Sequence, residues 1–368
     1  MPETIHTFED WVGAFHEWQE DIGFPTNLLG DFTFEAKYAD EDVSDTIEFG
    51  DFEGQPKWKR LLSVPHQNIR DALLNLIVYQ GDTEFASVEQ QRHLLENAPT
   101  EYDRKAALRV MAEEQRHGWQ MCHLLTHHFG EQGCEEAKRL LERRSWDKER
   151  LLGSFNEPVD NWVDFFVFTQ FVDRDGKYQL KMLSRSAFKP LASSMGPMLK
   201  EEAFHLGTGN SGIKRVLQSG KVPTDILQKY YNKWIPTAHD LFGTDNSSSA
   251  HWAYVWGLKG RFDEGETDEP VDKDDLNDRA RRQYHDEIQK AQELLNRNIQ
   301  GDQPQLVIPD MRFNRGIGRY KGEMYDIHGA PIESKSDYQE YLVRNLPSKE
   351  DTEVLADVFE AGDWIATK

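Results

Sequence analysis

Apolar residues recur every three or four positions through the middle of the chain, from about residue 65 to residue 242. This spacing places them on one face of an α-helix, the face that long helices bury against one another. The pattern predicts four long helices, at about residues 65–97, 100–129, 159–186 and 190–206. A short helix at about 133–144 links the second to the third. Four long helices in this order favour an antiparallel bundle.

The segments on either side of this bundle have other patterns. In the N-terminal part, an apolar stripe from Phe8 to Ile22 predicts a helix, and alternation in DFTFEAKYA and DTIEFGDFEG predicts short strands. After the bundle, GTDNSSSA and the acidic stretch 263–275 predict loops, followed by a helix and a tail of short strands and turns. We therefore expect a mixed extension at 1–62, the helical bundle at 63–243, and a C-terminal helical and short-strand extension at 244–368.

Composition excludes several classes of protein. The chain has 43 basic and 65 acidic residues, a net charge of -22, which argues against nucleic acid or an anionic membrane as partner. Its two cysteines form no CxxC, so a disulfide framework, a zinc knuckle and a four-cysteine iron–sulfur cluster are not expected. The sequence has no signal-peptide pattern at its N-terminus and no membrane-length apolar run. We expect a cytoplasmic protein.

Two of the long helices carry acids and histidines on their apolar faces. In EEQRHGWQM, Glu114 and His117 follow Ala107, Val110 and Met111 on one stripe. In EEAFHLGTG, the pair Glu202 and His205 repeats the arrangement. Burying an unpaired carboxylate costs roughly several kcal/mol, so such groups need a counter-charge. A single ExxH is more often an ordinary hydrogen-bonded core pair, but two copies on separate helices favour a metal site.

A dinuclear carboxylate site needs one more acid from each of the other two helices. On their apolar faces the first helix offers Glu84 and the third offers Asp175. Asp82 and Asp173 lie two residues away, about 200° round the helix, and are therefore not selected. The glutamate before each ExxH lies one residue off the stripe. Each half thus supplies an acid and then ExxH, as in an internal duplication, and four carboxylates balance the charge of two divalent ions.

The segments YQGDTEFASVEQQRHLL, EEQRHGWQM, VDRDGKYQL and EEAFHLGTGN resemble the catalytic subunit family of benzoyl-CoA 2,3-epoxidase. More distantly, they are similar to the catalytic subunit of phenylacetyl-CoA epoxidase. The resemblance extends from about residue 65 to 215. It implies a mostly α, ferritin-like di-iron four-helix bundle with N- and C-terminal extensions. It also implies two groups of iron ligands, namely Glu84, Glu114 and His117 in one half and Asp175, Glu202 and His205 in the other.

The activity that the resemblance implies is epoxidation of the ring of an aryl-CoA thioester, with benzoyl-CoA giving 2,3-epoxybenzoyl-CoA in aerobic aromatic catabolism. It further implies two iron ions, O2 as co-substrate, and a separate NADPH-dependent reductase that carries flavin and iron–sulfur centres, since this chain has neither. Three alternatives remain open. One is an oxygenase component that acts on phenylacetyl-CoA or another acyl-CoA with a scaffold subunit. The others are a non-catalytic ferritin-like metal-binding protein and a manganese–iron or radical-generating relative.

Four further residues are candidates for the surroundings of the metals. Gln80 lies one turn before Glu84 on the inner face, so it is placed to hydrogen-bond a ligand or to face substrate. Phe168, Phe171 and Met198 could line an apolar substrate pocket, although each is equally well explained as core.

Two motifs favour structural roles. GTGNSG, at residues 207–212, fits the spacing of a dinucleotide-binding loop but follows a helix rather than a strand, so it predicts a flexible break after the fourth helix, which could border the substrate entrance. Lys57, Lys59 and Arg60 form a basic cluster in an acidic chain. They could meet the phosphates of coenzyme A, but an ordinary surface cluster is the simpler interpretation.

Overall fold

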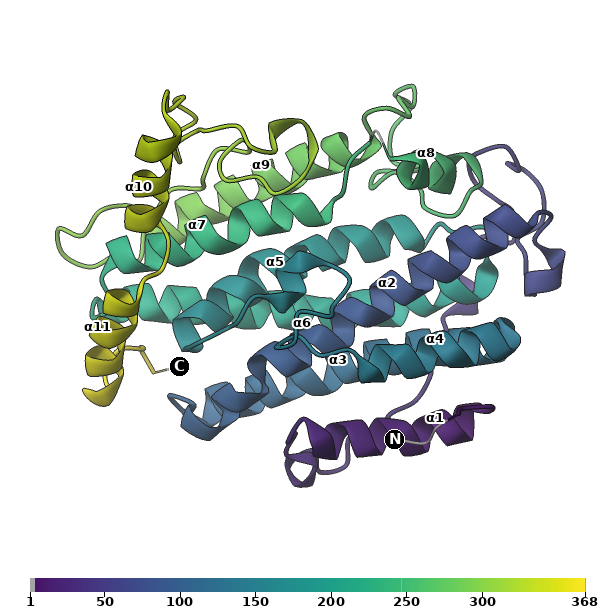
Figure 1. Ribbon diagram of the computed structural model, residues 1–368, viewed down its shortest axis with the longest axis horizontal. Helices are drawn as coiled ribbons and strands as arrows, with labels where there is room; N and C mark the ends of the chain where they lie inside the picture. Colours follow the sequence, from purple (N-terminus) through teal and green to yellow (C-terminus); the bar gives the residue numbers. More distant parts are fainter. Residues whose placement is uncertain (1–3, 246, 368) are drawn as a thin grey trace.

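The structure is a computed structural model that describes residues 4–245 and 247–367. Long helices dominate it (Figure 1), and the described part of the chain contains isolated β-bridges but no strand. The four longest helices are α2 (Gln67–Gln91), α3 (Glu101–His128), α5 (Trp162–Leu183) and α6 (Lys189–Ser219). The predicted four-helix bundle is confirmed. No helix among the described residues is both long and apolar enough to cross a bilayer.

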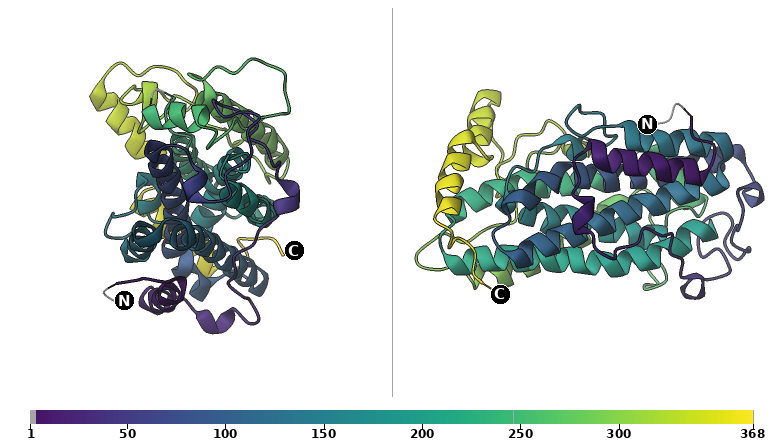
Figure 2. Two further views of the ribbon diagram at one scale, coloured as in Figure 1. Left: turned by 90° about the vertical axis from the view of Figure 1, so that its right-hand side faces the viewer. Right: turned by 90° about the horizontal axis from the view of Figure 1, so that it is seen from below.

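The bundle consists of two helical hairpins. Helix α2 packs along α3, α5 packs along α6, and α3 meets α6 between the hairpins. Two further layers cover it, as the end-on view in Figure 2 shows. One layer contains α1 (Phe8–Asp21) and α4 (Gly130–Glu142), and the other contains α7 (Thr224–Leu241) and α9 (Leu276–Asn296). The shorter helices α8 (Ser248–Val255), α10 (Lys335–Asn345) and α11 (Lys349–Glu360) complete the C-terminal part.

The ends of the bundle helices follow from local sequence. Thr100 accepts a hydrogen bond from the backbone N–H of Asp103 and caps α3, and Asn161 caps α5 in the same way. These short polar side chains satisfy backbone donors that have no partner within the helix. Helix α6 has a proline in its first turn and ends at Gly220, whose φ of 66° is left-handed. Glycine adopts that conformation without strain, so it is a natural end for the helix.

Helix α6 runs straight through residues 207–212, so the predicted break at GTGNSG is wrong. The glycines instead let α6 lie directly against α5. A Cβ on Gly209 would stand 2.5 Å from the backbone nitrogen of Gln170, and one on Gly212 would stand 2.1 Å from the ring of Phe166. No side chain fits in either place. The motif therefore serves helix packing at this contact.

Helix α5 is buried on two sides. Every residue from 161 to 175 is buried, because α6 covers one face while α7 and α9 cover the other. On the second face the ring of Phe168 meets Trp234 at a centroid distance of 4.9 Å, and the ring of Phe171 meets Tyr231 at 4.8 Å. Both aromatic pairs are edge-on. A helix that is apolar all round carries no single stripe to mark its inner face.

The strands predicted in the N-terminal extension and in the tail are wrong. Residues 31–54 contribute only to an isolated bridge between Thr46 and Pro56, and the tail contributes one between Tyr325 and Pro331. The N-terminal segment lies along the bundle instead, where the backbone N–H of Lys37 donates to Gln120 Oε1 at 2.7 Å. Its alternating apolar side chains therefore pack against helices. In the C-terminal part, α8 begins within GTDNSSSA, of which Asn246 lies outside the described residues.

Lys57 has a structural role within the predicted basic cluster. Its ammonium group is buried and donates to the carbonyl oxygens of Arg185 and Ser186 at 2.9 Å, just beyond the end of α5. It also pairs with Glu48 at 3.2 Å. A cation at a helix C-terminus is favourable, because carbonyl oxygens there lack partners. Lys57 is therefore not free to bind phosphate.

Candidate metal centre

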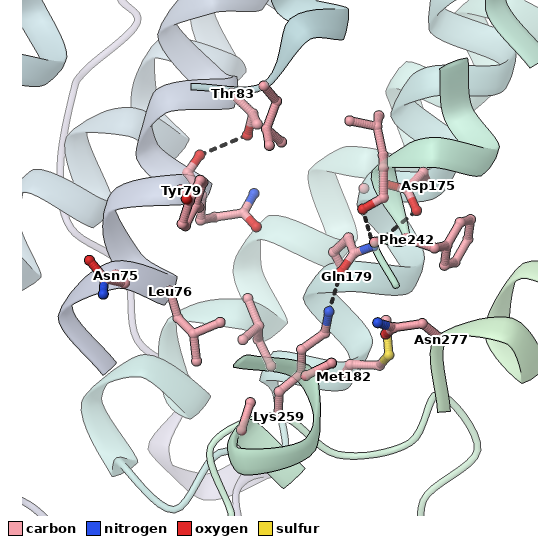
Figure 3. A pocket seen from close by; sticks show the side chains of 18 of the residues that line it. Asn75, Leu76, Tyr79, Thr83, Asp175, Gln179, Met182, Phe242, Lys259 and Asn277 are labelled. Atoms are coloured by element: carbon pink, nitrogen blue, oxygen red, sulfur yellow. Dashed lines mark hydrogen bonds between the residues drawn. The ribbon is translucent and has the colours of Figure 1, made fainter. Parts of the chain in front are cut away.

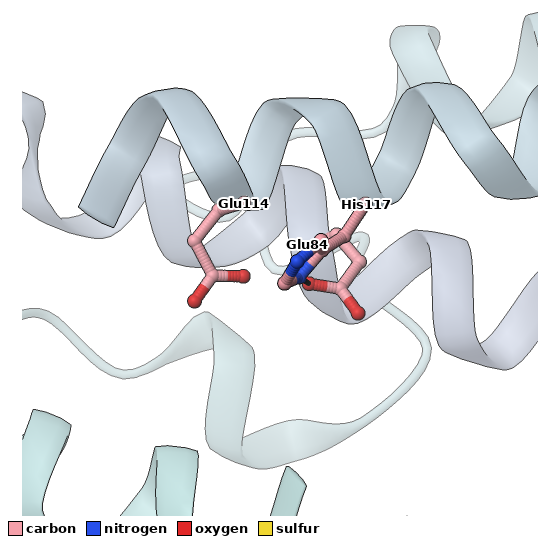
Figure 4. Close-up of side chains that lie close together, drawn as sticks. All are labelled: Glu84, Glu114 and His117. Carbon is pink, nitrogen blue, oxygen red and sulfur yellow. Dashed lines mark ion pairs between the residues drawn. The ribbon is translucent and has the colours of Figure 1, made fainter. Parts of the chain in front are cut away.

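Two groups of buried acids and histidines meet in the middle of the bundle. The first is Glu84, Glu114 and His117, and the second is Glu114, Glu202 and His205. Within each group the potential ligand atoms lie within 4.8 Å of one another. Figure 4 shows the first group, with Glu84 from α2 pointing toward Glu114 and His117 from α3. Glu114 belongs to both groups, as a carboxylate that bridges two ions would.

The Nδ1 atoms of both imidazoles face the carboxylates. His117 Nδ1 lies 3.4 Å from Glu84 Oε2 and 3.7 Å from Glu202 Oε1. His205 Nδ1 lies 3.3 Å from Glu114 Oε1 and 3.4 Å from Glu202 Oε2. Neither Nδ1 atom has a hydrogen-bond partner, although both are fully buried. These are the positions that metal-ligating nitrogens occupy.

The outer nitrogens of the two histidines bind carboxylates in a crossed arrangement. His117, on α3, donates from Nε2 to Glu201 of α6 at 2.9 Å, whereas His205, on α6, donates to Glu113 of α3 at 3.1 Å. In a neutral imidazole, donation from Nε2 leaves Nδ1 unprotonated, with its lone pair directed at the cluster. These two glutamates had no predicted role. The signal that marks them is the doubled acid in both motifs, EExxH.

Basic side chains hold these outer glutamates in place. The Nε of Arg116, which is fully buried, donates to Glu201 at 2.8 Å, and Lys37 pairs with the same carboxylate at 3.2 Å. Burial alone would raise the pKa of Glu201, but the hydrogen bonds from His117 and Arg116 lower it to about 2. Arg109 pairs with Glu113 at 2.9 Å. Both outer carboxylates are therefore ionised acceptors for the imidazole N–H groups.

The inner cluster has a surplus of negative charge. Burial and the charge of Glu84 raise the pKa of Glu114 well above its ordinary value. Although burial disfavours a charged imidazole, the carboxylates of Glu202, Glu113 and Glu114 raise the pKa of His205. All these shifts favour adding positive charge to the site, and bound divalent cations would supply it. Carboxylate oxygens and imidazole nitrogens are also donors that iron accepts.

Helix α5 carries three acids, and of the neighbouring pair Asp173 and Asp175 the one on the cluster side is Asp173 rather than the predicted Asp175. Asp175 accepts a hydrogen bond from Gln179 Nε2 at 3.0 Å, and neither member of this pair belongs to the 4.8 Å groups. The buried carboxylate of Asp173 lies on the cluster side, because its charge interacts with those of Glu202, His205 and Glu84, and its Oδ2 has no partner.

The two-sided burial of α5 explains the difference. The face with Phe168, Phe171 and Asp175, chosen from the sequence, packs toward α7 and α9. The face toward α6 carries Asp173 and Gly176, and a Cβ on Gly176 would lie 3.9 Å from Glu202 Oε1.

A cavity of about 750 Å³ leads from the surface to this cluster. Figure 3 shows its walls, with α2 residues such as Tyr79 on one side and α5 residues such as Asp175 on the other, together with Phe242, Lys259 and Asn277. Apolar side chains line much of it, including Leu76, Val172, Met182 and Phe242. The carboxylates that line it at the cluster are Glu84, Glu114, Asp173 and Glu202.

The structure places the other predicted pocket residues as follows. Gln80 lines the cavity, and its Nε2 donates to Glu84 Oε1. Phe168, Phe171 and Met198 do not line it. The two phenylalanines pack on α7, and Met198 is fully buried in the bundle. Their apolar character therefore reflects the core.

Comparison with known proteins agrees with this architecture. The family model described as phenylacetic acid catabolic protein matches residues 63–293. Benzoyl-CoA oxygenase component B of Aromatoleum evansii is 40% identical over 302 residues, which cover 70% of this chain and 63% of that protein. One of the subunits of 1,2-phenylacetyl-CoA epoxidase from Escherichia coli (strain K12) is 24% identical over 305 residues, 80% of this chain and 86% of that protein.

This chain thus spans less than two thirds of the length of the first relative. Both relatives agree with the resemblance that the four motifs indicated, and the predicted ferritin-like bundle with extensions is confirmed. The match of the family model over residues 63–293 covers more than half of the chain, including the whole bundle. The chain belongs to the phenylacetic acid catabolic protein family.

Proposed function

We propose that this chain is the oxygenase component of an aryl-CoA epoxidase and that it converts benzoyl-CoA to 2,3-epoxybenzoyl-CoA. The observation that carries this proposal is a largely apolar cavity of about 750 Å³ that ends at buried carboxylates and imidazoles. A volume of this size suits an aromatic acyl group with part of its carrier. The 40% identity with a benzoyl-CoA oxygenase component supports the choice of acyl group.

In this proposal two iron ions bind to Glu84, Glu114, His117, Glu202 and His205, and Asp173 is the acid from α5. The unpartnered buried atoms of His117, His205, Glu202 and Asp173 support this donor set. When bound, the irons supply the redox chemistry with O2, so that one oxygen atom enters the ring and the other leaves as water with two protons and two electrons. The protein supplies ligand orientation and a site that excludes water.

The residues around the cluster have separate tasks. Glu113 and Glu201 hold both imidazoles with Nδ1 directed inward. Gln80 fixes one carboxylate oxygen of Glu84 and leaves the other free for a metal. The apolar walls keep water from the ring, and contacts to the coenzyme A part, remote from the reaction, position the ring.

Electrons must come from another protein in this proposal, because each turnover consumes two. The name component B, carried by the first relative, supports a multi-component oxygenase. We infer a separate NADPH-dependent reductase with flavin and iron–sulfur centres. The two cysteines of this chain, both buried, are too few for an iron–sulfur cluster held by four cysteines.

Phenylacetyl-CoA is the second candidate substrate. The chain matches 86% of the length of one phenylacetyl-CoA epoxidase polypeptide, although at only 24% identity. The two acyl groups differ by one methylene, which a hydrophobic pocket distinguishes by about 10- to 200-fold. In that case a scaffold subunit would also be required for activity.

The test is turnover by purified, iron-loaded protein with NADPH, a reductase and 18O2. We expect about two irons per chain and an epoxide with one 18O atom from benzoyl-CoA, none from free benzoate, and at least tenfold less from phenylacetyl-CoA. Glu114→Ala should lose both iron and activity, since Glu114 belongs to both ligand groups. Equal conversion of free benzoate would contradict the acyl-CoA proposal. Iron binding without oxidation of any acyl-CoA would favour a non-catalytic metal protein.

A further inference from the structure

A chain of three polar side chains crosses one wall of the cavity, away from the carboxylate cluster. The ammonium group of Lys259 donates to Gln179 Oε1 at 2.7 Å, and Gln179 Nε2 donates to Asp175 Oδ1 at 3.0 Å (Figure 3). All three residues line the cavity. None of the three belongs to the two groups of potential metal ligands. A purely apolar cavity wall would contain no such polar side chains.

The ammonium group of Lys259 has fewer hydrogen-bond acceptors around it than it has donors. Within residues 4–245 and 247–367, Gln179 is its one hydrogen-bond acceptor, and the charges of Asp175 and Asp245 act on it without forming an ion pair. An ammonium group has three donors, so two remain for a molecule in the cavity. Burial lowers the pKa of Lys259, which reflects how little its surroundings compensate the charge. An oxygen acceptor inside the cavity would recover this desolvation cost.

The position of the Lys259 ammonium group along the bundle suits the carbonyl oxygen of an aryl thioester whose ring lies at the cluster. Gly176 faces Glu202 of the cluster, and Gln179 follows it by three residues on α5. At a rise of 1.5 Å per residue, the Cα atom of Gln179 stands about 4.5 Å further along the helix axis than that of Gly176. The carbonyl oxygen of an aroyl thioester is separated from the meta carbons of the ring by a comparable length. A ring at the cluster would therefore bring its carbonyl oxygen toward Lys259.

We propose that Lys259, oriented by Gln179, binds the carbonyl oxygen of the acyl thioester and so sets which ring carbons face the cluster. Asp175 acts as a positioning residue. By accepting from the Gln179 N–H, it turns the amide oxygen toward Lys259 and keeps the ammonium group at the cavity wall. This inference rests on the proposed function, since it names an acyl-CoA as the ligand. It assigns Asp175 to substrate positioning, in place of the iron-ligand role that the sequence suggested.

The test is a comparison of two ligands by calorimetry, with full-length, iron-loaded protein in the absence of O2. Benzoyl-CoA carries the carbonyl oxygen, whereas S-benzyl-CoA has a methylene in its place. A hydrogen bond from a charged donor should give the wild type about a 10- to 100-fold preference for benzoyl-CoA. Lys259→Met should reduce that preference to less than about threefold, chiefly by weakening benzoyl-CoA, with S-benzyl-CoA little changed.

Lys181→Met is the matched control, because Lys181 lies on α5 and does not line the cavity. It should keep the wild-type preference. Gln179→Leu provides a second variant, independent of whether Lys259→Met folds, and should reduce the preference at least threefold.

A wild type without preference, or a Lys259→Met protein that keeps it, would overturn the inference while leaving acyl-CoA binding intact. Failure of the wild type to bind either thioester would instead overturn the proposed function, and this inference with it.

Discussion

Replacing Gly209 by alanine tests the close contact between α5 and α6. The added Cβ would lie 2.5 Å from the backbone nitrogen of Gln170 and 2.9 Å from two further backbone carbons. Non-bonded carbon contacts settle near 3.5 Å, so the helices must separate by roughly 1 Å, and no change of rotamer relieves backbone atoms. Overpacking of this kind costs about 1–3 kcal/mol, against which alanine gains about 1 kcal/mol in helix propensity.

Gly207→Ala is the matched control on the same helix. Gly207 is exposed, and a Cβ there would meet nothing within 4 Å, so only the propensity gain of about 1 kcal/mol applies. The two variants should therefore differ by about 1–3 kcal/mol in free energy of unfolding. With an unfolding entropy of about 2.1 cal/mol/K per residue, 1 kcal/mol corresponds to about 1.3 °C for 368 residues.

Calorimetric melting should thus place Gly209→Ala about 1–4 °C below Gly207→Ala. Iron content should also fall in Gly209→Ala, because a shift of α6 displaces Glu202 and His205, which lie two turns and one turn earlier on that helix, respectively. Equal melting temperatures and equal iron content in the two variants would refute the argument that this contact needs glycine.

Three further variants test the site. Glu113→Gln should lower iron affinity about 10- to 100-fold, measured by competition with a chelator, because His205 loses its charged acceptor, while Arg109, 54% exposed, tolerates the loss. Asp173→Asn should reduce bound iron and Asp175→Asn should not; metal analysis in which only Asp175→Asn lost iron would reverse the assignment. Burial raises the pKa of Asp175 from 3.8 to about 7, so its ionisation costs stability increasingly as pH rises through that window. Asp175→Asn should therefore gain free energy of unfolding relative to the wild type between about pH 4 and pH 7, by at most ~4 kcal/mol, and the difference should level off above pH 7. A difference that stays constant across this range would contradict the reasoning.

The sequence predicted the bundle because apolar residues recur at helical spacing along each of its long helices. On α3 the apolar stripe leads directly to Glu114 and His117, and on α6 it leads to Glu202 and His205, all of which the structure brings together. Helical periodicity is sufficient to show that these side chains share one stripe of their helix.

On α5 the same reasoning selected Asp175, whereas Asp173 is the acid whose neighbours are the charges of Glu202, His205 and Glu84. That helix is covered by α6 on one face and by α7 and α9 on the other, so Asp173 and Asp175 both lie on apolar faces. Periodicity within one helix contains no information about which neighbour covers which face. The close contact of Gly209 and Gly212 with α5 marks the face of α5 that meets α6. From the sequence, the spaced glycines of GTGNSG were interpreted as a break in the helix instead.

The strand predictions failed for a related reason. Alternation of apolar and polar residues shows that a segment has one buried side, and it leaves open what covers that side. Residues 31–54 have no extended partner and lie on the bundle, so no ladder forms. The tail likewise forms only an isolated bridge, between Tyr325 and Pro331.

The crossed bonds of the two histidines make each half of the duplicated bundle dependent on the other. His117 is completed by Glu201 of the opposite hairpin, and His205 is completed by Glu113. A single hairpin taken by itself carries an outer glutamate that its own histidine does not use. It could complete the surroundings of its histidine only by pairing with another hairpin. A substitution in one hairpin therefore changes the ligand environment in the other.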